Sequence, residues 1–223
     1  MMTNLFSIFD PASPNFFSTN WLSSLLFVLL YPSVKWISND RCNKLFMLLK
    51  SYLFKEFSPI VKKTSFVLLI MVSILLFILF NNMMGLFPYV FTSSAHLSFS
   101  LCFGLTSWVS LMVYGWTHNY NNLLVHLIPQ GTPGVLMPFM VIIESVSNII
   151  RPGTLAVRLS ANMIAGHLLL SLLSNAFIGL PFLLVPLLTM VEVLLMSLEL
   201  AVAFIQSYVF SVLLTLYVAE FSD

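Results

Sequence analysis

The chain has 223 residues, of which 59% are hydrophobic and only 8% carry a charge. An ordinary soluble domain is about 25% charged, so this composition cannot cover a water-facing surface and excludes a soluble globular enzyme. The net charge of +1 provides no basic field for nucleic acid. Cys42 and Cys102 form no CxxC pair and no zinc spacing. We therefore expect a single integral-membrane domain over residues 1–223, with no cofactor and no bound metal.

The N-terminal segment, residues 1–36, contains the first expected membrane span. A helix needs about 20 apolar residues to cross the roughly 30 Å hydrocarbon layer, and residues 17–36 supply them, with Pro32 as a late interruption. The residues before this span include Asp10 but no Lys or Arg, which is typical of neither a secretory signal nor a mitochondrial transit peptide. Either the span is its own insertion signal, or the protein is made in the compartment that uses it.

Residues 37–63 predict an amphipathic helix that lies on the membrane surface. Apolar side chains recur at helical spacing, and lysines occupy the other face. The apolar positions are Leu45, Leu48, Leu49, Tyr52 and Leu53. Seven of the nine Lys and Arg residues lie between Lys35 and Lys63, and such clusters mark the cytoplasmic or matrix side of a membrane. The N-terminus is then expected on the opposite side.

Residues 64–117 predict two further spans. The first covers residues 64–80 and is expected to continue to residue 91, and the second covers residues 97–116. Neither span has a charged residue in its middle, as expected for helices that contact lipid.

Two overlong apolar stretches, residues 135–177 and 178–219, fill most of the C-terminal segment, residues 132–223. Each would measure about 65 Å as a helix, about twice the thickness of the bilayer core. We expect a hairpin of two long, strongly tilted or bent helices, with bends at Pro152-Gly153 and Pro181. The predicted fold class is therefore all-α: a polytopic membrane protein with about five membrane segments and one surface helix.

Five polar residues of the first overlong stretch share one helical face. Seven residues make nearly two turns, which aligns Glu144, Arg151 and Arg158, while Asn148 and Asn162 fall on the same side. A guanidinium group is never deprotonated, and placing it in the bilayer costs from about 2.5 to over 10 kcal/mol. The arginines therefore indicate an anionic partner, in this chain or in another. Arg151 fits equally an interfacial position beside a glutamate of this chain, an alternative that Arg158 fits poorly.

The second overlong stretch carries Glu192, Glu199 and Gln206, again seven residues apart and on one face. Burial favours the protonated form of a carboxyl group and a nearby cation favours the ionised form, so such a residue can exchange protons. The alternative is a hydrogen bond between helices, which fits Glu192 better than Glu199. His167 lies on the face opposite Arg158, either as a proton relay or as a buried hydrogen-bond donor.

The stretches RPGTLAVRLSANMIAGHLLLSLL and LELAVAFIQSYVFSVLLTLY resemble the signature sequences of subunit a of F-type ATP synthases, the membrane stator of a rotary motor. NNMMGLFPYVFT and PQGTP also fit, so the resemblance covers nearly the whole chain and is greatest to mitochondrial, invertebrate forms. It implies a location in the mitochondrial inner membrane, with the N-terminus in the intermembrane space and the surface helix 37–63 on the matrix side. The implied partners are the c-subunit ring, the peripheral-stalk subunit b, other small membrane-sector subunits and the lipid bilayer.

The resemblance also implies roles for individual residues. Arg158 matches the family's essential arginine, which faces the carboxylates of the c-ring, and Asn162 matches the asparagine one turn further on. His167 and Glu199 match a proton-relay pair that serves the half-channel from the intermembrane space. In bacterial relatives the two members of this pair are exchanged.

The remaining polar residues divide into two groups. Glu144 matches the acid of the matrix half-channel, and Gln206 matches the glutamine near the arginine. Glu192, Asn148 and Arg151 match no general feature of the family and stay candidates for an additional polar path. The chain lacks a GxxxxGK[ST] motif, so we expect a proton-translocating subunit that binds no nucleotide and is no enzyme by itself.

Two other classes of membrane protein are alternatives to this interpretation. A self-contained proton-coupled transporter is compatible with intramembrane Glu, His and Arg, but the chain is small and lacks an internal repeat. A haem- or quinone-binding anchor is conceivable because the chain has four histidines. They do not form the repeated pairs that a haem with two histidine ligands needs.

Overall fold

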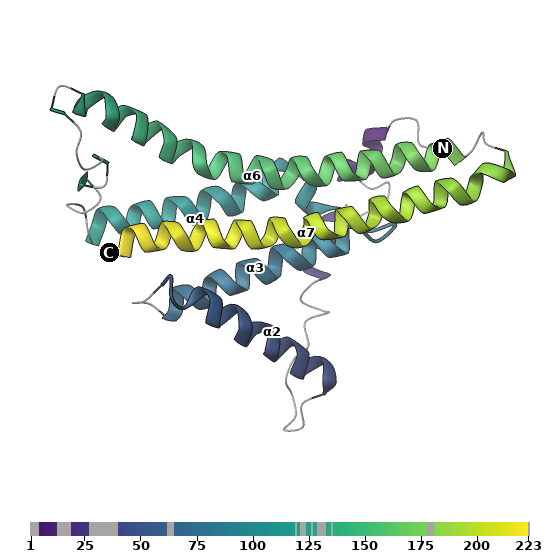
Figure 1. The fold of residues 1–223 in the computed structure, drawn as a ribbon, viewed down its shortest axis with the longest axis horizontal. Coiled ribbons are helices and arrows are strands. Elements are labelled where there is room, and N and C mark those ends of the chain that lie inside the picture. Colours follow the sequence, from purple (N-terminus) through teal and green to yellow (C-terminus); the bar gives the residue numbers. More distant parts are fainter. Residues whose placement is uncertain are drawn as a thin grey trace.

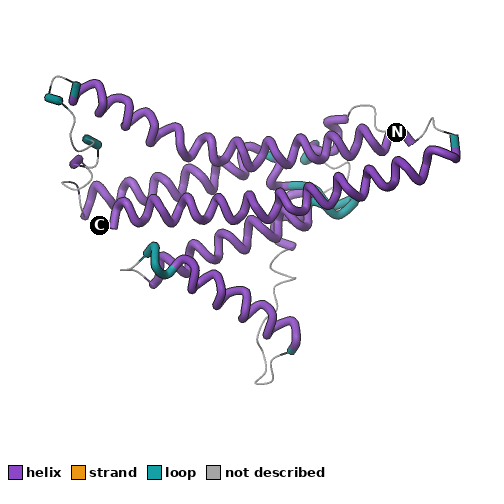
Figure 2. Tube along the Cα trace, in the orientation of Figure 1, coloured by secondary structure: helices purple, strands orange, loops and turns teal. Residues whose placement is uncertain are grey.

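The computed structural model describes residues 5–12, 19–26, 40–61, 65–118, 120, 124–125, 127–128, 133–134, 136–177 and 181–222, and these form helices and loops without a strand (Figure 2). In chain order the elements are η1 (Leu5–Phe9), η2 (Thr19–Leu25), α2 (Arg41–Phe57), α3 (Ser65–Gly85), η3 (Ser93–Ala95), α4 (Leu97–His118), α6 (Met137–Ala176), η5 (Phe182–Leu184) and α7 (Val185–Ser222). The predicted all-α class is confirmed. Most of the expected first span, residues 17–36, lies outside the described residues, and residues 19–25 of it form the 3-10 helix η2.

Four helices in the described part of the chain are long and apolar enough to cross a membrane: α3, α4, α6 and α7. The second predicted span ends earlier than expected, since α3 stops at Gly85 and not near residue 91. Pro88 cannot continue a helix, and the chain turns back closely enough that a Cβ atom on Gly85 would lie 3.0 Å from Cγ2 of Thr92.

The C-terminal hairpin consists of α6, with 40 residues, and α7, with 38 residues. At 1.5 Å per residue they measure about 60 Å and 57 Å, well beyond the bilayer core. They run antiparallel along most of the molecule (Figure 1). α6 passes through Pro152 without interruption and changes direction near its middle (Figure 1). The predicted break near Pro181 is present, since α7 begins at Val185.

The shorter spans support the long helices in pairs. α6 packs mainly on α4, and α7 packs mainly on α3. Gly104 of α4 allows a close crossing, since a Cβ atom there would lie 3.3 Å from the Pro152 carbonyl oxygen and 3.4 Å from the Ala156 Cβ atom. Leu159 of α6, Phe210 of α7 and residues of α3 share one hydrophobic core. The long helices α6 and α7 therefore pack on the shorter helices α3 and α4.

The predicted amphipathic helix of residues 37–63 is α2, which projects from the bundle and meets α3 at one end (Figure 1). Leu53 and Phe57 are buried against α3, and Phe46 stacks on Phe80 with ring centroids 5.7 Å apart. The rest of the predicted apolar face is exposed, with Leu48 70% and Tyr52 62% accessible. α2 therefore presents an apolar surface that the bundle does not cover.

Candidate functional site

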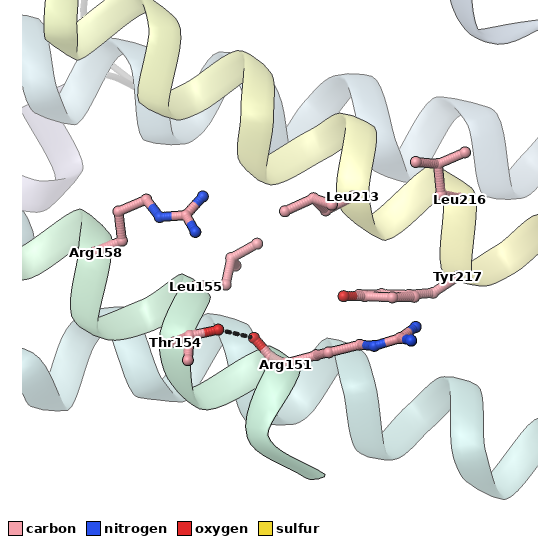
Figure 3. A pocket seen from close by; sticks show the side chains of 7 residues that line it. All are labelled: Arg151, Thr154, Leu155, Arg158, Leu213, Leu216 and Tyr217. Atoms are coloured by element: carbon pink, nitrogen blue, oxygen red, sulfur yellow. Dashed lines mark hydrogen bonds between the residues drawn. The ribbon is translucent and has the colours of Figure 1, made fainter. Parts of the chain in front are cut away.

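A pocket of about 320 Å³ lies between α6 and α7. Its lining comprises Arg151, Thr154, Leu155 and Arg158 of α6 and Leu213, Leu216 and Tyr217 of α7 (Figure 3). Thr154 Oγ1 donates a hydrogen bond of 2.9 Å to the carbonyl oxygen of Arg151. The seven-residue spacing thus brings both arginines of the predicted stripe to one cavity, because two helical turns return to the same face.

Arg151 is held by two groups at one end of this pocket. Its Nη2 atom donates to Oε1 of Glu144 at 3.4 Å, and the side chains of Arg151 and Glu144 are 37% and 33% exposed. Its guanidinium carbon lies 5.8 Å from the centroid of the Tyr217 ring, within the range of a cation–π contact. For Arg151, the alternative of a glutamate partner in this chain is therefore confirmed.

Arg158, unlike Arg151, has no partner among the residues that the structure describes. Its side chain is exposed and lies along the pocket (Figure 3). Within the ranges that the structure describes, it makes no hydrogen bond or ion pair, so neither Glu192 nor Glu199 compensates its charge. An arginine exposed on an apolar helix is costly in lipid. Its position therefore suits an anionic group brought by another chain.

Glu199 of α7 lies directly against Gly166 of α6. A Cβ atom on Gly166 would stand 2.8 Å from Cδ and 2.9 Å from Oε1 of Glu199, so the carboxyl group fits only because the glycine has no side chain. Glu199 is 9% exposed. The neighbouring residue, His167, packs its ring edge-on against Phe9 with centroids 6.3 Å apart. The structure thus brings the predicted Glu199 and His167 to the same crossing of α6 and α7.

The pocket and this crossing are separate regions of the hairpin. His167 follows Arg158 by nine positions along α6, a rise of about 14 Å. The other predicted residues, Asn148, Asn162, Glu192 and Gln206, are half-buried and do not belong to the pocket lining.

The sequence pattern did not predict a buried polar cluster that lies around α3 and η3. Asn82 is 1%, Thr92 2% and Ser94 1% exposed. Both amide atoms of Asn82, the hydroxyl oxygens of Thr92 and Ser94, and Nε2 of His96 are buried without a hydrogen-bond partner in the described part of the chain. The His96 ring lies 5.2 Å from Trp21 and 5.1 Å from Phe91. The sequence feature that could have predicted this cluster is the polar pair Asn81-Asn82, which lies inside an apolar stretch of 20 residues.

This cluster adjoins the crossing of Glu199 and His167. Ala95 of η3 shares a hydrophobic cluster with Met163 and Ala203, which lie one helical turn from His167 and Glu199 respectively. Oε1 of Glu199 and Nε2 of His167 are also buried without a partner among the described residues. Buried polar atoms in proteins are nearly always hydrogen-bonded, to protein or to water. The two groups together therefore form a polar region, suited to water, within an apolar bundle.

Comparison with known proteins identifies the family of the chain. The family model for the ATP synthase A chain matches residues 17–219. ATP synthase subunit a of Drosophila melanogaster is 52% identical over 222 residues, and that of Locusta migratoria is 52% identical over 223 residues. The subunit of Aedes aegypti is 48% identical over 224 residues. Each alignment covers 99% of both chains.

The fold and the site define a polytopic membrane protein with titratable and charged residues inside its spans, the class that moves ions through a bilayer. The chain belongs to the ATP synthase subunit a family. It is thus a membrane-sector subunit of ATP synthase, and the family resemblance inferred from AVRLSAN and its neighbours is confirmed.

Proposed function

We propose that this chain conducts protons across the mitochondrial inner membrane through two offset half-channels that meet a ring of c subunits at Arg158. The observation that carries the proposal is the exposed guanidinium of Arg158, which lines the pocket of α6 and α7 and has no hydrogen-bond or ion-pair partner among the described residues. A carboxylate on the passing ring is the anion that this permanent cation would stabilise.

The entry half-channel is assigned to Glu199, His167 and the polar cluster of α3 and η3. Glu199 and His167 can both accept and donate protons, and the buried polar atoms of Asn82 and Ser94 can order water beside them. A proton delivered here neutralises a ring carboxylate, which can then pass through lipid at low cost.

The exit half-channel is assigned to the opposite end of the hairpin, where Glu144 lies near the start of α6. A ring carboxylate that ionises near Arg158 releases its proton toward this end. The guanidinium also repels a proton that would cross directly from one half-channel to the other. Each charge that moves across 100 mV provides about 2.3 kcal/mol, which biases the rotation of the ring toward ATP synthesis.

The charge distribution supports an orientation. α2 ends beside the start of α3, at the same end of the molecule as the start of α6 and the end of α7 (Figure 1). Lys55 lies in the last turn of α2, and the stretch of residues 35–63, which holds all six lysines, is typical of the matrix side, so we assign this end to the matrix. The turn between α6 and α7 and the N-terminus then face the intermembrane space. The further partners in this proposal are the peripheral-stalk subunit b and the small membrane-sector subunits.

The test is the Arg158→Ala substitution in the intact ATP synthase, reconstituted into liposomes. We expect the complex to assemble on a native gel and to lose ATP-driven proton pumping, because no cation remains to stabilise the ionised ring carboxylate. Normal coupled pumping in an assembled Arg158→Ala complex would contradict the proposal. Proton-coupled transport by the purified chain alone would instead support a self-contained transporter.

A further inference from the structure

Arg158 has a role in the proposed function, whereas Arg151 has none there. Arg151 lies between Glu144 on its own helix and Tyr217 on α7, and it shares the pocket with Arg158. The inference that follows rests on the proposed function, since it concerns the exit route that contains Glu144.

A carboxylate on a proton route also attracts metal cations. Carboxylate oxygens are the preferred ligands of hard cations such as Ca²⁺, and Glu144 is one-third exposed. In a cell, metal cations outnumber protons by many orders of magnitude. At a water-accessible Glu144 without charge compensation, metal cations would gather near the carboxylate and compete with protons for it, and its proton exchange would be slowed.

Arg151 supplies that compensation in a fixed form. Its Nη2 atom lies 3.4 Å from Oε1 of Glu144. The face of Tyr217 supports the guanidinium from the other helix, and this ring lies flat beside the Arg151 side chain (Figure 3). Because a guanidinium group keeps its charge at every physiological pH, the compensation does not vanish when protons move.

The rest of the pocket has the same sign. Its described lining contains two guanidinium groups and no carboxylate. Fixed positive charges along a narrow pore exclude cations. The guanidinium groups also repel an excess proton inside the pocket, but exchange at Glu144 needs only proton transfer between its carboxyl group and water, without a cation having to reside beside Arg151.

We propose that Arg151 is the residue that determines the cation specificity of the exit route: it keeps metal cations off Glu144, so that only protons are exchanged there. Tyr217 is a positioning residue for Arg151 in this scheme.

The experiment uses the whole ATP synthase in liposomes and measures ATP-driven proton pumping while Na⁺ replaces choline at constant ionic strength, and then with added Ca²⁺. Wild-type pumping should change little over the concentrations used, with half-inhibition only at far higher concentrations of metal cation. In Arg151→Gln, pumping should fall as Na⁺ or Ca²⁺ rises, with a half-inhibiting concentration about tenfold or more below that of wild type, since one full charge is lost close to the carboxylate. Lower pH should relieve this inhibition because protons compete for Glu144. Arg151→Lys, which keeps the charge, should restore insensitivity.

Two further variants make the result specific. Arg41→Gln, the same change at an exposed position of α2, is the matched control and should pump normally without cation sensitivity. The double variant Glu144→Gln with Arg151→Gln removes the carboxylate too and should pump more slowly, but the pumping that remains, expressed relative to its own rate in choline, should be insensitive to metal cations. Sensitivity in the double variant would show that metal ions bind elsewhere and would overturn the proposal.

Pumping by Arg151→Gln that is indifferent to Na⁺ and Ca²⁺ would also overturn the proposal while leaving the proton-conducting function intact. That function is tested separately by Arg158→Ala. If Arg151→Gln prevents assembly, Tyr217→Leu provides the measurement, since it frees the guanidinium from its support. Cation sensitivity weaker than the tenfold shift is then expected, and complete insensitivity refutes the role of Arg151.

Discussion

The contact between Gly166 and Glu199 leads to a quantitative prediction for Gly166→Ala. The new Cβ atom would stand 2.8 Å from Cδ of Glu199. Reaching an ordinary contact of 3.4 Å requires a shift of 3.4 − 2.8 = 0.6 Å. The carboxyl end can make this shift by rotating about its side-chain bonds, and a rotation of about 30° away from a rotamer costs roughly 0.5–1.5 kcal/mol.

That cost acts on the proton-exchanging group itself. If displaced Glu199 must return to its present position for each transfer, 0.5–1.5 kcal/mol corresponds to a rate about twofold to tenfold lower, at 1.36 kcal/mol per factor of ten. Stability should change little, because replacing a helical glycine by alanine contributes roughly 0.5–1 kcal/mol in the favourable direction. We therefore expect an assembled complex with slow proton transport.

Gly153→Ala is the matched control, on the same helix. A Cβ atom on Gly153 meets no atom within 4 Å, so this variant gains the same helix preference without touching Glu199. The assay is passive proton conduction through the membrane sector in liposomes, normalised to the amount of assembled complex. Equal conduction by Gly166→Ala and Gly153→Ala would refute the idea that Glu199 depends on the space at Gly166.

Three further predictions follow from the same contacts. Glu199→Gln should assemble but reduce proton conduction by about 10²-fold or more, as for loss of a general acid–base group, and conduction near the wild-type rate would remove Glu199 from the route. Arg158→Lys keeps a positive charge but loses the planar fork, so partial pumping is expected, measured as the initial rate of ATP-driven acidification, and full activity would show that charge alone suffices. Gly104→Leu should destabilise the complex by about 1–3 kcal/mol through overpacking, because the Pro152 carbonyl oxygen lies 3.3 Å from the Cβ position. The measurement is the unfolding temperature, which should fall. An unchanged temperature would argue against a tight crossing of α4 and α6.

Much of the fold was predictable because lipid leaves few alternatives. Apolar length alone located α3, α4, α6 and α7, since backbone groups in a bilayer must be satisfied within a helix. The predicted end of α3 was wrong, because the residues beyond Gly85 are as apolar as the helix itself. The helix stops at Gly85 because Pro88 cannot continue it and the chain turns back to bring Thr92 against Gly85. The pairing of α6 with α4 and of α7 with α3 was out of reach, since in lipid it depends on local fit, which a periodic pattern does not encode.

The site was predictable where residues share one helix and not where they meet across helices. A spacing of seven residues placed Glu144, Arg151 and Arg158 on one face, and the structure joins the first two directly and the last two through the pocket. The contact of Glu199 with Gly166 and the support of Arg151 by Tyr217 depend on the relative rotation of α6 and α7. That rotation is set by tertiary packing. The spacing of residues along one helix therefore could not predict either contact.

The pairing of each long helix with an earlier, shorter one has a consequence for biogenesis. Chains are synthesised from the N-terminus, so α4 is already in the membrane when α6 leaves the ribosome, and α3 is present before α7. Each long helix can therefore pack on its shorter partner as soon as it enters the membrane, before the hairpin of α6 and α7 is complete. The order of the segments along the chain thus lets the early spans α3 and α4 act as a template on which the long hairpin assembles.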